Sequence, residues 1–349
     1  MRILSIETSC DETAMAVVDA KGGLKVPSFS VIESLVFSQI PMHREFGGVV
    51  PNIAKREHEK MLPVLFEELS KKIDPESVDL ISVTMGPGLE PALWTGIEFA
   101  RGLAKKMDRP LFGANHLKGH LYSFLLDPIA RGRMFPSIAL IVSGGHTVIL
   151  SMKSLTEFKK IGETRDDAAG EAFDKAARLL GLPYPGGPEI EKAAKKGNPK
   201  AVLFPRPMLD QKNYDMSFAG LKTSLLYYIK GAHKADWKEF NKPSGSVRPD
   251  DYENLAASFQ AAIIDCLIGK TMRAADNLKA RSVILAGGVA ANSSLRSAFA
   301  EGAMKRSMSF FAPSMKYNTD NAAMIAVGTY IEHLSGIKRR ISAKGDLGI

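Results

Sequence analysis

Apolar stretches separated by polar turns predict an alternation of strands and helices from the first residues onward. Strands are expected at residues 3–6 and 14–18, and the hydroxyl-rich turn 7–13 joins them as a β-hairpin. Apolar residues at helical spacing predict a helix over residues 52–72, and a strand over 78–84 leads through a glycine loop into a second helix. Strands and helices that alternate in this way are typical of an α/β fold.

The same pattern begins again in the second half of the chain. Strands at residues 137–142 and 148–152 enclose the turn 143–147 and form a second hairpin. This recurrence predicts a duplicated fold, with an N-terminal lobe over residues 1–130 and a C-terminal lobe over 131–349 that carries a helical insert at about 162–270. A strand is also predicted over 283–286, a helix from Ser293 and a last helix over about 321–335. Two stretches, 183–207 and around 241–251, are expected to be rich in loops. The basic tail over 337–349 is expected to be mobile.

Length and composition are those of an ordinary globular protein. The 349 residues suffice for two domains, and 45% of them are apolar and 24% charged. No apolar run approaches the roughly 20 residues of a membrane span, and the first six residues are too short for a secretory signal. Two cysteines make no disulfide framework, so a cytoplasmic location is expected. The net charge of +8 favours a polyanionic partner such as nucleic acid.

Three turns at the ends of apolar strands are candidate nucleotide contacts. They are Thr8-Ser9, residues 143–147 and Gly287-Gly288. Glycine lets a backbone approach an anion closely, and strand ends are where α/β folds place their ligands. One such turn alone is also an ordinary tight turn, but three of them indicate a nucleotide site. The chain has no P-loop motif and no Gly-x-Gly-x-x-Gly after its first strand, which disfavours a P-loop or dinucleotide-binding domain.

His116 and His120 are the strongest local signal for a metal ion. Two imidazoles four residues apart lie on one face of a helix and can bind one ion; alternatively, one caps the helix and the other packs in the core. A zinc protease of the His-Glu-x-x-His type needs a glutamate where this chain has Leu117, so peptide hydrolysis is disfavoured. Spacing does not choose a third ligand. Asp320 is a candidate, although it would serve equally well as a helix N-cap.

The acidic residues around position 170 occupy two different kinds of position in a predicted helix. Asp166 and Asp167 suit the first turn of a helix, where negative charge is stabilised. Asp174 lies inside the predicted helix beside Phe173, where a carboxylate needs a partner, for example a ligand hydroxyl. Residues 185–188 are predicted to form an open turn that can approach a ligand.

Together these motifs resemble one family along most of the chain, the TsaD/Gcp family of tRNA threonylcarbamoyladenosine-synthesis transferases, long called O-sialoglycoprotein endopeptidase. The likeness is greater to its bacterial and organellar branch than to its archaeal one. The matching stretches run in order over residues 6–13, 46–51, 115–120, 142–147, 167–174, 184–188, 217–223, 287–292 and 319–321.

This resemblance implies a fold, a reaction and partners. The fold is the actin-like ATPase and sugar-kinase (ASKHA) fold, two lobes around a nucleotide cleft. The reaction transfers threonylcarbamoyl from threonylcarbamoyl-adenylate to N6 of the adenosine 3′ to the anticodon, in tRNAs that read ANN codons. The implied partners are tRNA, a related protein of the same fold and a small ATPase.

The resemblance also implies site residues, carried over position by position. His116, His120 and Asp320 bind one metal ion, usually iron and sometimes zinc. The adenylate-binding residues are Ile141, Val142, Ser143, Gly144, Gly145, Asp174, Gly187, Glu191 and Asn292.

The base that accepts the amine proton stays open. Glu7, Asp11 and Glu12 at the first hairpin tip are catalytic candidates, or else simply solvated loop residues. The chain also departs from its bacterial relatives at two positions. Lys118 stands where they usually carry glutamate, and we expect its cation to lie near the metal; Asn318 stands where they often carry cysteine.

Two alternatives to the transferase remain. A small-molecule kinase of the same fold would leave the histidine pair without a role. A non-catalytic scaffold of a tRNA-modifying complex predicts the loss of ligands, yet His116, His120 and Asp320 are all present.

Overall fold

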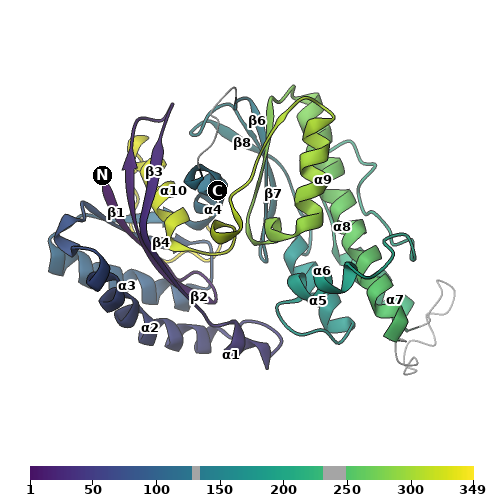
Figure 1. Ribbon diagram of the computed structural model, residues 1–349, viewed down its shortest axis with the longest axis horizontal. Helices are drawn as coiled ribbons and strands as arrows, with labels where there is room; N and C mark the ends of the chain where they lie inside the picture. The colour runs from purple at the N-terminus through teal and green to yellow at the C-terminus, as the bar shows by residue number, and fades with distance from the viewer. Residues whose placement is uncertain (128–133, 231–248) are drawn as a thin grey trace. The chain divides into compact units, whose positions relative to one another are not determined.

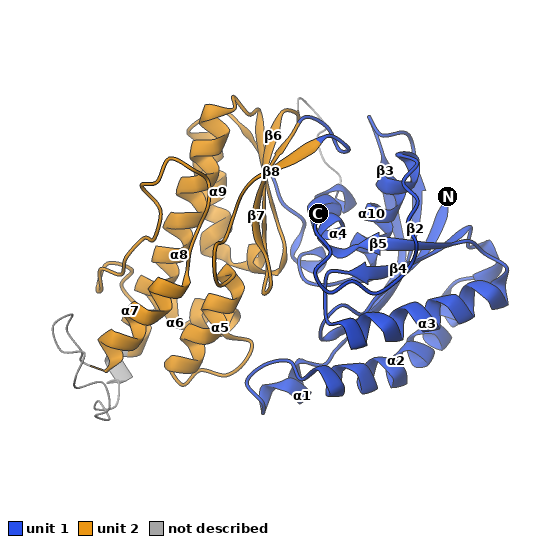
Figure 2. Ribbon diagram, turned by 180° about the vertical axis from the view of Figure 1, so that it is seen from behind, with its two compact units in different colours: residues 1–132, 153–157, 311–349 blue, residues 133–152, 158–310 orange. Residues whose placement is uncertain are grey.

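The chain divides into two compact units. The computed structural model describes residues 1–127, 134–230 and 249–349. Unit 1 comprises Met1–Gly132, Lys153–Glu157 and Phe311–Ile349, and unit 2 comprises Arg133–Met152 and Phe158–Phe310 (Figure 2). The predicted boundary at residues 130/131 lies outside the described residues. The segment from Phe311 onward belongs to unit 1, whereas the predicted C-terminal lobe continued to residue 349.

Unit 1 is built on a five-stranded sheet in the order β3-β2-β1-β4-β5 (Figure 1). Its strands are β1 (Arg2–Glu7), β2 (Glu12–Lys21), β3 (Ser28–Ser38), β4 (Leu80–Gly86) and β5 (Leu111–Asn115). The first three strands pair antiparallel, and β4 and β5 extend the sheet parallel to β1. The helices of this unit are α1 (Ile40–Arg44), α2 (Pro51–Lys72), α3 (Glu90–Met107), α4 (His116–Tyr122) and α10 (Ala322–Leu334), with 3-10 turns η1 (Pro75–Ser77), η2 (Ser123–Leu126) and η5 (Met315–Tyr317).

Alternating residues of β1 face two different helical layers. Leu4 and Ile6 belong to the core cluster that also holds the buried leucines of α2 and the apolar face of α3. Ser5 points the other way and donates a hydrogen bond to Ala322 O at the start of α10 (2.6 Å). In β4, Ser82 is hydrogen-bonded to Thr329 of α10. A helix from the end of the chain therefore covers the face of the sheet opposite to α2 and α3 (Figure 1).

Unit 2 repeats this sheet. Its order is β10-β9-β6-β7-β8, with β6 (Ser137–Val142), β7 (Thr147–Met152), β8 (Phe158–Glu163), β9 (Ser282–Ala286) and β10 (Ser309–Phe311). Again three strands form an antiparallel meander, and the next strand, β9, lies parallel to the first. The correspondence confirms the predicted duplicated α/β fold.

Most helices of unit 2 lie in the predicted helical insert. They are α5 (Ala169–Leu179), α6 (Gly186–Ala194), α7 (Ala219–Ile229) and α8 (Pro249–Asn277); the 3-10 turn η4 (Gly288–Ala291) and α9 (Ser293–Met304) follow β9. The stretch 183–207 was expected to be loop-rich, but it contains α6, because the Pro-Gly-Gly-Pro sequence begins a helix instead of forming an open turn. Most of the loop predicted around 241–251 lies outside the described residues.

One helix, α8, is long and apolar enough to resemble a membrane span. Within Tyr252–Asn277, however, 72% of the most apolar window is buried inside the protein. This is the behaviour of a core helix in a soluble protein.

The basic tail packs on unit 1, so the expectation that it is mobile is wrong. Ile341 and Leu347 pack against the core cluster of this unit. Lys344 N donates to Met85 O (2.9 Å) at the end of β4. These contacts hold the tail at the strand ends beside which α4 begins.

Candidate metal centre

The helix α4 presents the two histidines side by side. It begins directly after β5, and Asn115 caps it by accepting a hydrogen bond from Lys118 N (3.0 Å). The Asn115 amide also donates to Gly348 O of the tail (2.8 Å). The rings of His116 and His120 lie with their centroids 4.7 Å apart. The segment is therefore helical, which is the condition for residues four apart to share one face.

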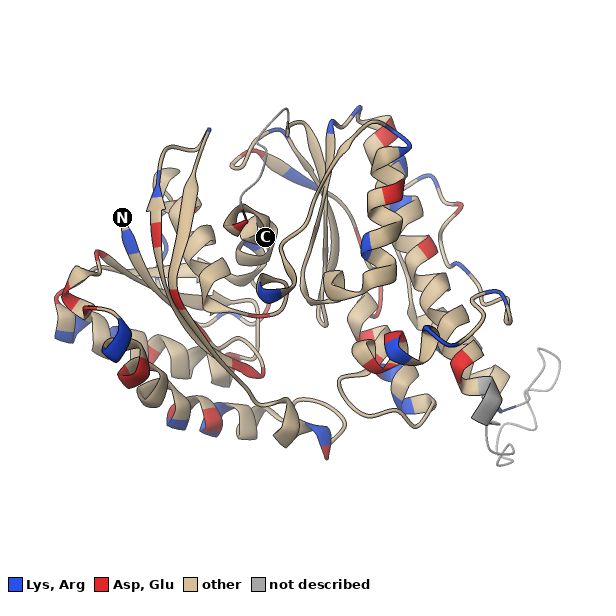
Figure 3. Cartoon of the chain, in the orientation of Figure 1, with Lys and Arg blue, Asp and Glu red and all other residues tan. Residues whose placement is uncertain are grey.

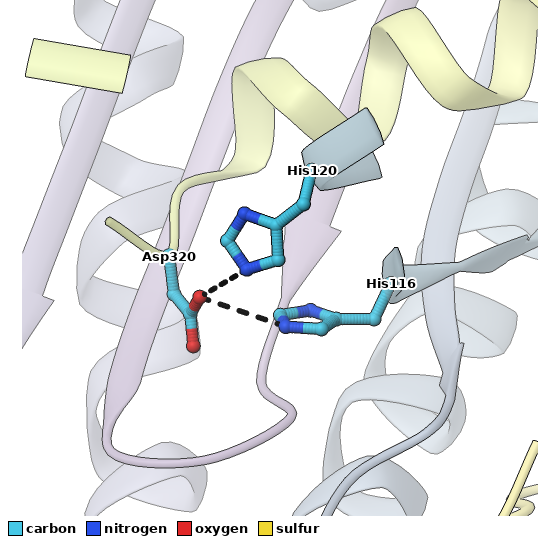
Figure 4. Close-up of side chains that lie close together, drawn as sticks. All are labelled: His116, His120 and Asp320. Atoms are coloured by element: carbon cyan, nitrogen blue, oxygen red, sulfur yellow. Dashed lines mark ion pairs between the residues drawn. The ribbon is translucent and has the colours of Figure 1, made fainter. Parts of the chain in front are cut away.

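Asp320 completes a group of three possible ligands (Figure 4). Its Oδ1 lies 3.0 Å from His120 Nε2 and 3.5 Å from His116 Nε2. The neighbouring Asn321, not Asp320, caps α10 by accepting a hydrogen bond from Met324 N (2.9 Å). The N-cap alternative for Asp320 is therefore excluded, and its carboxylate faces the histidines.

These three side chains fit a metal ion. Among the described residues, both ring nitrogens of His120 are buried without a hydrogen-bond partner, although Nε2 is close to Asp320. A buried nitrogen without a partner is costly unless something else uses its lone pair. Ligands bound at 2.0–2.2 Å to a tetrahedral ion lie roughly 3.3–3.5 Å apart, which is close to the separations seen here. The donor set, two imidazoles and one carboxylate, is typical of zinc and of non-haem iron.

Glu7 orients His116 for this role. His116 Nδ1 donates to Glu7 Oε2 (3.0 Å), and the Ser9 hydroxyl lies 3.2 Å from the same nitrogen. With its proton on Nδ1, a neutral His116 directs the lone pair of Nε2 toward Asp320. A carboxylate behind a ligating histidine fixes its tautomer and raises its basicity. This pairing was missed in the sequence, where Glu7 was interpreted only as a candidate base.

Both carboxylate oxygens of Glu7 accept hydrogen bonds. Its side chain is buried; Oε1 accepts from Ser9 N (2.5 Å) and Oε2 from the Thr84 hydroxyl (2.6 Å). Burial raises the pKa of Glu7, but the facing His116 outweighs this and lowers it. Glu7 is therefore an ionised hydrogen-bond acceptor inside unit 1.

The charges of Glu7, His116 and Asp320 influence one another's pKa values. Burial lowers the pKa of His116, yet the carboxylates of Glu7 and Asp320 outweigh it and raise this pKa to about 9. Burial likewise raises the pKa of Asp320, but the histidines lower it to about 2. Without metal, His116 therefore carries a second proton at neutral pH, and a metal ion must displace that proton to bind.

The pKa of Glu12, in the acidic turn between β1 and β2, is shifted in the opposite direction to that of Glu7. Burial and the adjacent Asp11 raise the pKa of Glu12 well above its usual value, and the charge of Asp320 contributes in the same direction. The Ser38 hydroxyl donates to Glu12 Oε1 (3.3 Å). Asp11 is itself nearly buried. The tip of the hairpin thus carries a buried Asp11 beside a partly buried Glu12, not a fully solvated loop.

The predicted phosphate turn at Thr8-Ser9 has other partners. The Thr8 hydroxyl is buried and donates to Ala92 O of α3 (3.0 Å). The backbone N–H of Ser9 donates to Glu7. These groups stabilise unit 1 itself, so the interpretation of Thr8-Ser9 as a phosphate contact is not supported.

The predicted adenylate residues all belong to unit 2, and five of them lie at the end of β6 and in the turn after it. Ile141 and Val142 are buried in the sheet, and the turn after them is closed by Ser143 N donating to His146 O (2.8 Å). Space is open beside the Cα atoms of Gly144 and Gly145, while a Cβ on Gly170 would lie 2.6 Å from Ser143 O. The first turn of α5 therefore packs directly against an open glycine turn.

The remaining predicted residues of this group have partners inside unit 2. Asp174 Oδ1 accepts from Gly186 N (2.7 Å), so a ligand hydroxyl is not needed to explain its place in α5. Glu191 Oε1 accepts from Ser293 N (3.0 Å) at the start of α9. Asn292 caps α9, and its amide donates to Gln260 Oε1 (2.7 Å). Gly187 has open space where a side chain would begin.

Gly287 occupies a position that only glycine fits. Its φ is +94°, and a Cβ there would lie 2.4 Å from Val142 O. The turn between β9 and η4 therefore passes directly beneath the end of β6.

Lys118 does not place a cation at the metal ligands, contrary to expectation. Two residues along an α-helix turn the side chain through about 200°, so Lys118 leaves α4 on the side opposite His116 and His120. Its Nζ donates to the buried Glu332 of α10 (2.7 Å), which Arg339 also contacts.

The fold is that of the ASKHA class, and the His-His-Asp group of unit 1 could hold a metal ion. HypF from T. kodakarensis matches 95% of this chain and 48% of its own, with a TM-score of 0.60 and 15% identity. The activator of 2-hydroxyisocaproyl-CoA dehydratase from Clostridium difficile matches 97% of this chain and 99% of its own, with a TM-score of 0.51 and 13% identity. These likenesses are of fold alone.

Sequence comparison identifies the family. The model of the TsaD family, described as tRNA N6-adenosine threonylcarbamoyltransferase, matches residues 30–327. The protein of that description from Thermotoga neapolitana is 46% identical over 340 residues, 97% of this chain and 96% of that protein. The one from Thermosipho melanesiensis is 49% identical over 333 residues, 95% of this chain and 94% of that protein.

The chain therefore belongs to the TsaD family, and it is an enzyme that transfers a threonylcarbamoyl group to N6 of an adenosine in tRNA. This confirms the resemblance read from the motifs, and it disfavours the kinase and scaffold alternatives.

Proposed function

We propose that this chain takes the threonylcarbamoyl group from threonylcarbamoyl-adenylate and attaches it to the adenosine 3′ to the anticodon, in tRNAs that read ANN codons. The new bond joins the adenine N6 to the carbamoyl carbon. The bond from that carbon to the phosphate oxygen breaks, and AMP leaves. The observation that carries this proposal is the intact His116, His120 and Asp320 group in a chain that matches its named relatives over 95–97% of its length.

His116, His120 and Asp320 hold one metal ion in this proposal. The resemblance favours iron, and the same donors also suit zinc. When bound, the ion supplies Lewis-acid stabilisation of the negative charge that develops on the reacting group. Glu7 keeps His116 in the tautomer that can ligate.

Unit 2 binds the adenylate in this proposal. The open turn Ser143-Gly144-Gly145 can point backbone N–H groups at a phosphate, as glycine-rich turns at strand ends do. Gly187 can approach the ligand closely because no side chain intervenes. The carboxylates of Asp174 and Glu191 and the amide of Asn292 are the proposed polar contacts.

The acidic pair Asp11 and Glu12 is the proposed acceptor of the amine proton. A general base works best when its pKa is close to the working pH. Burial and the negative charge of Asp11 raise the pKa of Glu12 in that direction. The ionised and hydrogen-bonded Glu7 is poorly suited to this role.

Paired glutamine variants separate these two roles. We expect Glu7→Gln to weaken metal affinity by about 10- to 100-fold, because the ligating histidine loses its orienting carboxylate. We expect Glu12→Gln to keep metal affinity and to lower kcat by about 10²- to 10⁴-fold. Competition with a chelator measures the first effect and single-turnover kinetics the second. Full metal affinity in Glu7→Gln together with a large loss of kcat would instead make Glu7 the base.

The proposed partners are tRNA, a related protein of the same fold and a small ATPase, and the proposed location is the cytoplasm. The formal charge of +8 suits a polyanionic substrate. On α2, however, acids and bases alternate as ion pairs such as Lys55–Glu59 and Lys71–Glu67 (Figure 3). With five Lys and Arg against four Glu, that helix supplies little of the surplus positive charge.

A reconstitution tests the proposed reaction. The chain is combined with both partner proteins, tRNA, and threonylcarbamoyl-adenylate made from threonine, bicarbonate and ATP. We expect the modified nucleoside and AMP in equal amounts, measured by mass spectrometry and chromatography. A tRNA with guanosine in place of the target adenosine is the control and gives no product. Absence of product from the native tRNA, or product without this chain, would contradict the proposal.

A further inference from the structure

Buried polar side chains form a chain of hydrogen bonds beneath the turn that carries Asp11 and Glu12. Its members are Gln39 just before α1, His43 in α1 and His58 in α2, and all three side chains are fully buried. None of them belongs to the metal centre. Such a network is expensive to bury unless every group has a partner.

The hydrogen bonds determine which nitrogen of each imidazole carries the proton. Val50 N donates to His43 Nδ1 (3.3 Å), so His43 Nε2 carries the proton and donates to Gln39 Oε1 (3.1 Å). The amide nitrogen of Gln39 lies 3.3 Å from His58 Nδ1, whose lone pair it shares with the closer hydroxyl of Thr13, and it also donates to Ala54 O (3.4 Å). His58 Nε2 in turn donates to Cys10 O (3.0 Å). All donors point in one direction, from Val50 to Cys10.

This arrangement requires both histidines to be neutral. A proton added to His43 Nδ1 or His58 Nδ1 would place a donor against another donor. Burial lowers the pKa of His43 and the pKa of His58, which favours the neutral forms. The network is therefore fully satisfied at neutral pH.

The network ends on the backbone of the acidic turn. Besides the bond from His58 to Cys10 O, the backbone N–H of Gln39 donates to Asp11 O (2.8 Å). The Thr13 hydroxyl donates to His58 Nδ1 (2.8 Å). Contacts on residues 10, 11 and 13 therefore hold the main chain on both sides of Glu12.

We propose that His58 and Gln39 are positioning residues for the turn Cys10–Thr13 and set the place of its two carboxylates for the transfer reaction. The inference rests on the proposed role of Asp11 and Glu12 in that reaction. Misplacing a reacting group by about 1 Å costs about a hundredfold in rate, so the support beneath the turn has a direct effect on catalysis.

Three variants of α2 test this inference in the reconstituted complex. His58→Leu removes the contacts of the imidazole with Gln39, Thr13 and Cys10 O, while His58→Gln keeps an amide donor for Cys10 O. Leu62→Ala, one turn further along α2, is the matched control, because it creates a cavity in the core without touching the turn. The measurements are kcat, KM for tRNA, metal content, and amide hydrogen exchange of residues 10–13.

We expect His58→Leu to lower kcat by about a hundredfold and to lose exchange protection in residues 10–13, with KM and metal content unchanged. His58→Gln should restore most of the rate, and Leu62→Ala should lower thermal stability but keep kcat. Normal kcat and protection in His58→Leu, or an equal loss of kcat in Leu62→Ala, would overturn the inference. If His58→Leu does not fold, Thr13→Val decides by the same signature.

The experiments distinguish an error in the proposed base from an error in the positioning role of His58. If Glu12→Gln keeps full kcat, the acidic turn is not the base. Hydrogen exchange then still tests the positioning role: loss of protection at residues 10–13 in His58→Leu supports it, and retained protection contradicts it.

Discussion

Replacement of His120 by alanine is expected to remove the metal ion and to lower threonylcarbamoyl transfer by about 10³-fold. The loss corresponds to roughly 4 kcal/mol of transition-state stabilisation, within the several kcal/mol that a Lewis-acid metal contributes. His120 is expected to be decisive because its buried Nε2 faces the Asp320 carboxylate at 3.0 Å without a well-aligned hydrogen bond, which suits a nitrogen that shares an ion with that carboxylate. The folded protein should survive, since the variant removes a buried polar group that was not satisfied.

Metal content by elemental analysis and single-turnover kinetics measure this effect. His333→Ala is the matched control, because His333 lies on the exposed side of α10, where its ring contacts Phe112. The control should keep both metal and rate. One metal ion per chain and an unchanged rate in His120→Ala would show that the three side chains do not form the metal site.

Replacement of Glu332 by alanine is expected to cost about 3–5 kcal/mol of the free energy of unfolding. Glu332 is 2% exposed and accepts hydrogen bonds from Lys118 (2.7 Å) and from both terminal nitrogens of Arg339 (2.5 Å each). Removing one partner of a buried ion pair leaves the other charge without compensation, and this is what makes the change costly. Since Lys118 belongs to α4, the variant also loosens the helix that carries both histidines.

Urea unfolding of the single and triple variants measures this cost. Lys118→Met and Arg339→Met combined with Glu332→Leu remove all three charges of the cluster and are expected to recover most of the loss, as apolar replacements of buried ion pairs do. Glu98→Ala is the control, because the Glu98–Arg101 pair is exposed and such pairs contribute about 0–1 kcal/mol. An equal cost for Glu332→Ala and Glu98→Ala would refute the prediction.

The sequence predicted those strands and helices in which apolar residues recur at a regular spacing over several turns or alternations. Both hairpins, α2 and α10 were found in this way, since alternation and helical spacing are properties of neighbouring residues. The edge strands β3, β8 and β10 were not predicted: β3 is half exposed and β10 has only three residues. The parallel strand β5, of five residues, was also missed.

The candidate site could be predicted only in part, for the same reason. The spacing of His116 and His120 was visible because both lie on one helical face. Their partners come from distant parts of the chain: Glu7 is 109 residues before His116, and Glu332 is 214 residues after Lys118. No local period connects residues so far apart.

The family, the duplicated hairpins and the spacing of the two imidazoles can all be read from the amino-acid order. The contacts of the site cannot: that Asp320 faces the histidines while Asn321 caps α10, that Glu7 orients His116, and that Lys118 is neutralised away from the ligands became visible in the folded chain. Hydrogen bonds and ion pairs depend on distances of a few ångströms. Between residues remote in the sequence, those distances are set by the packing of α4 and α10 against the sheet.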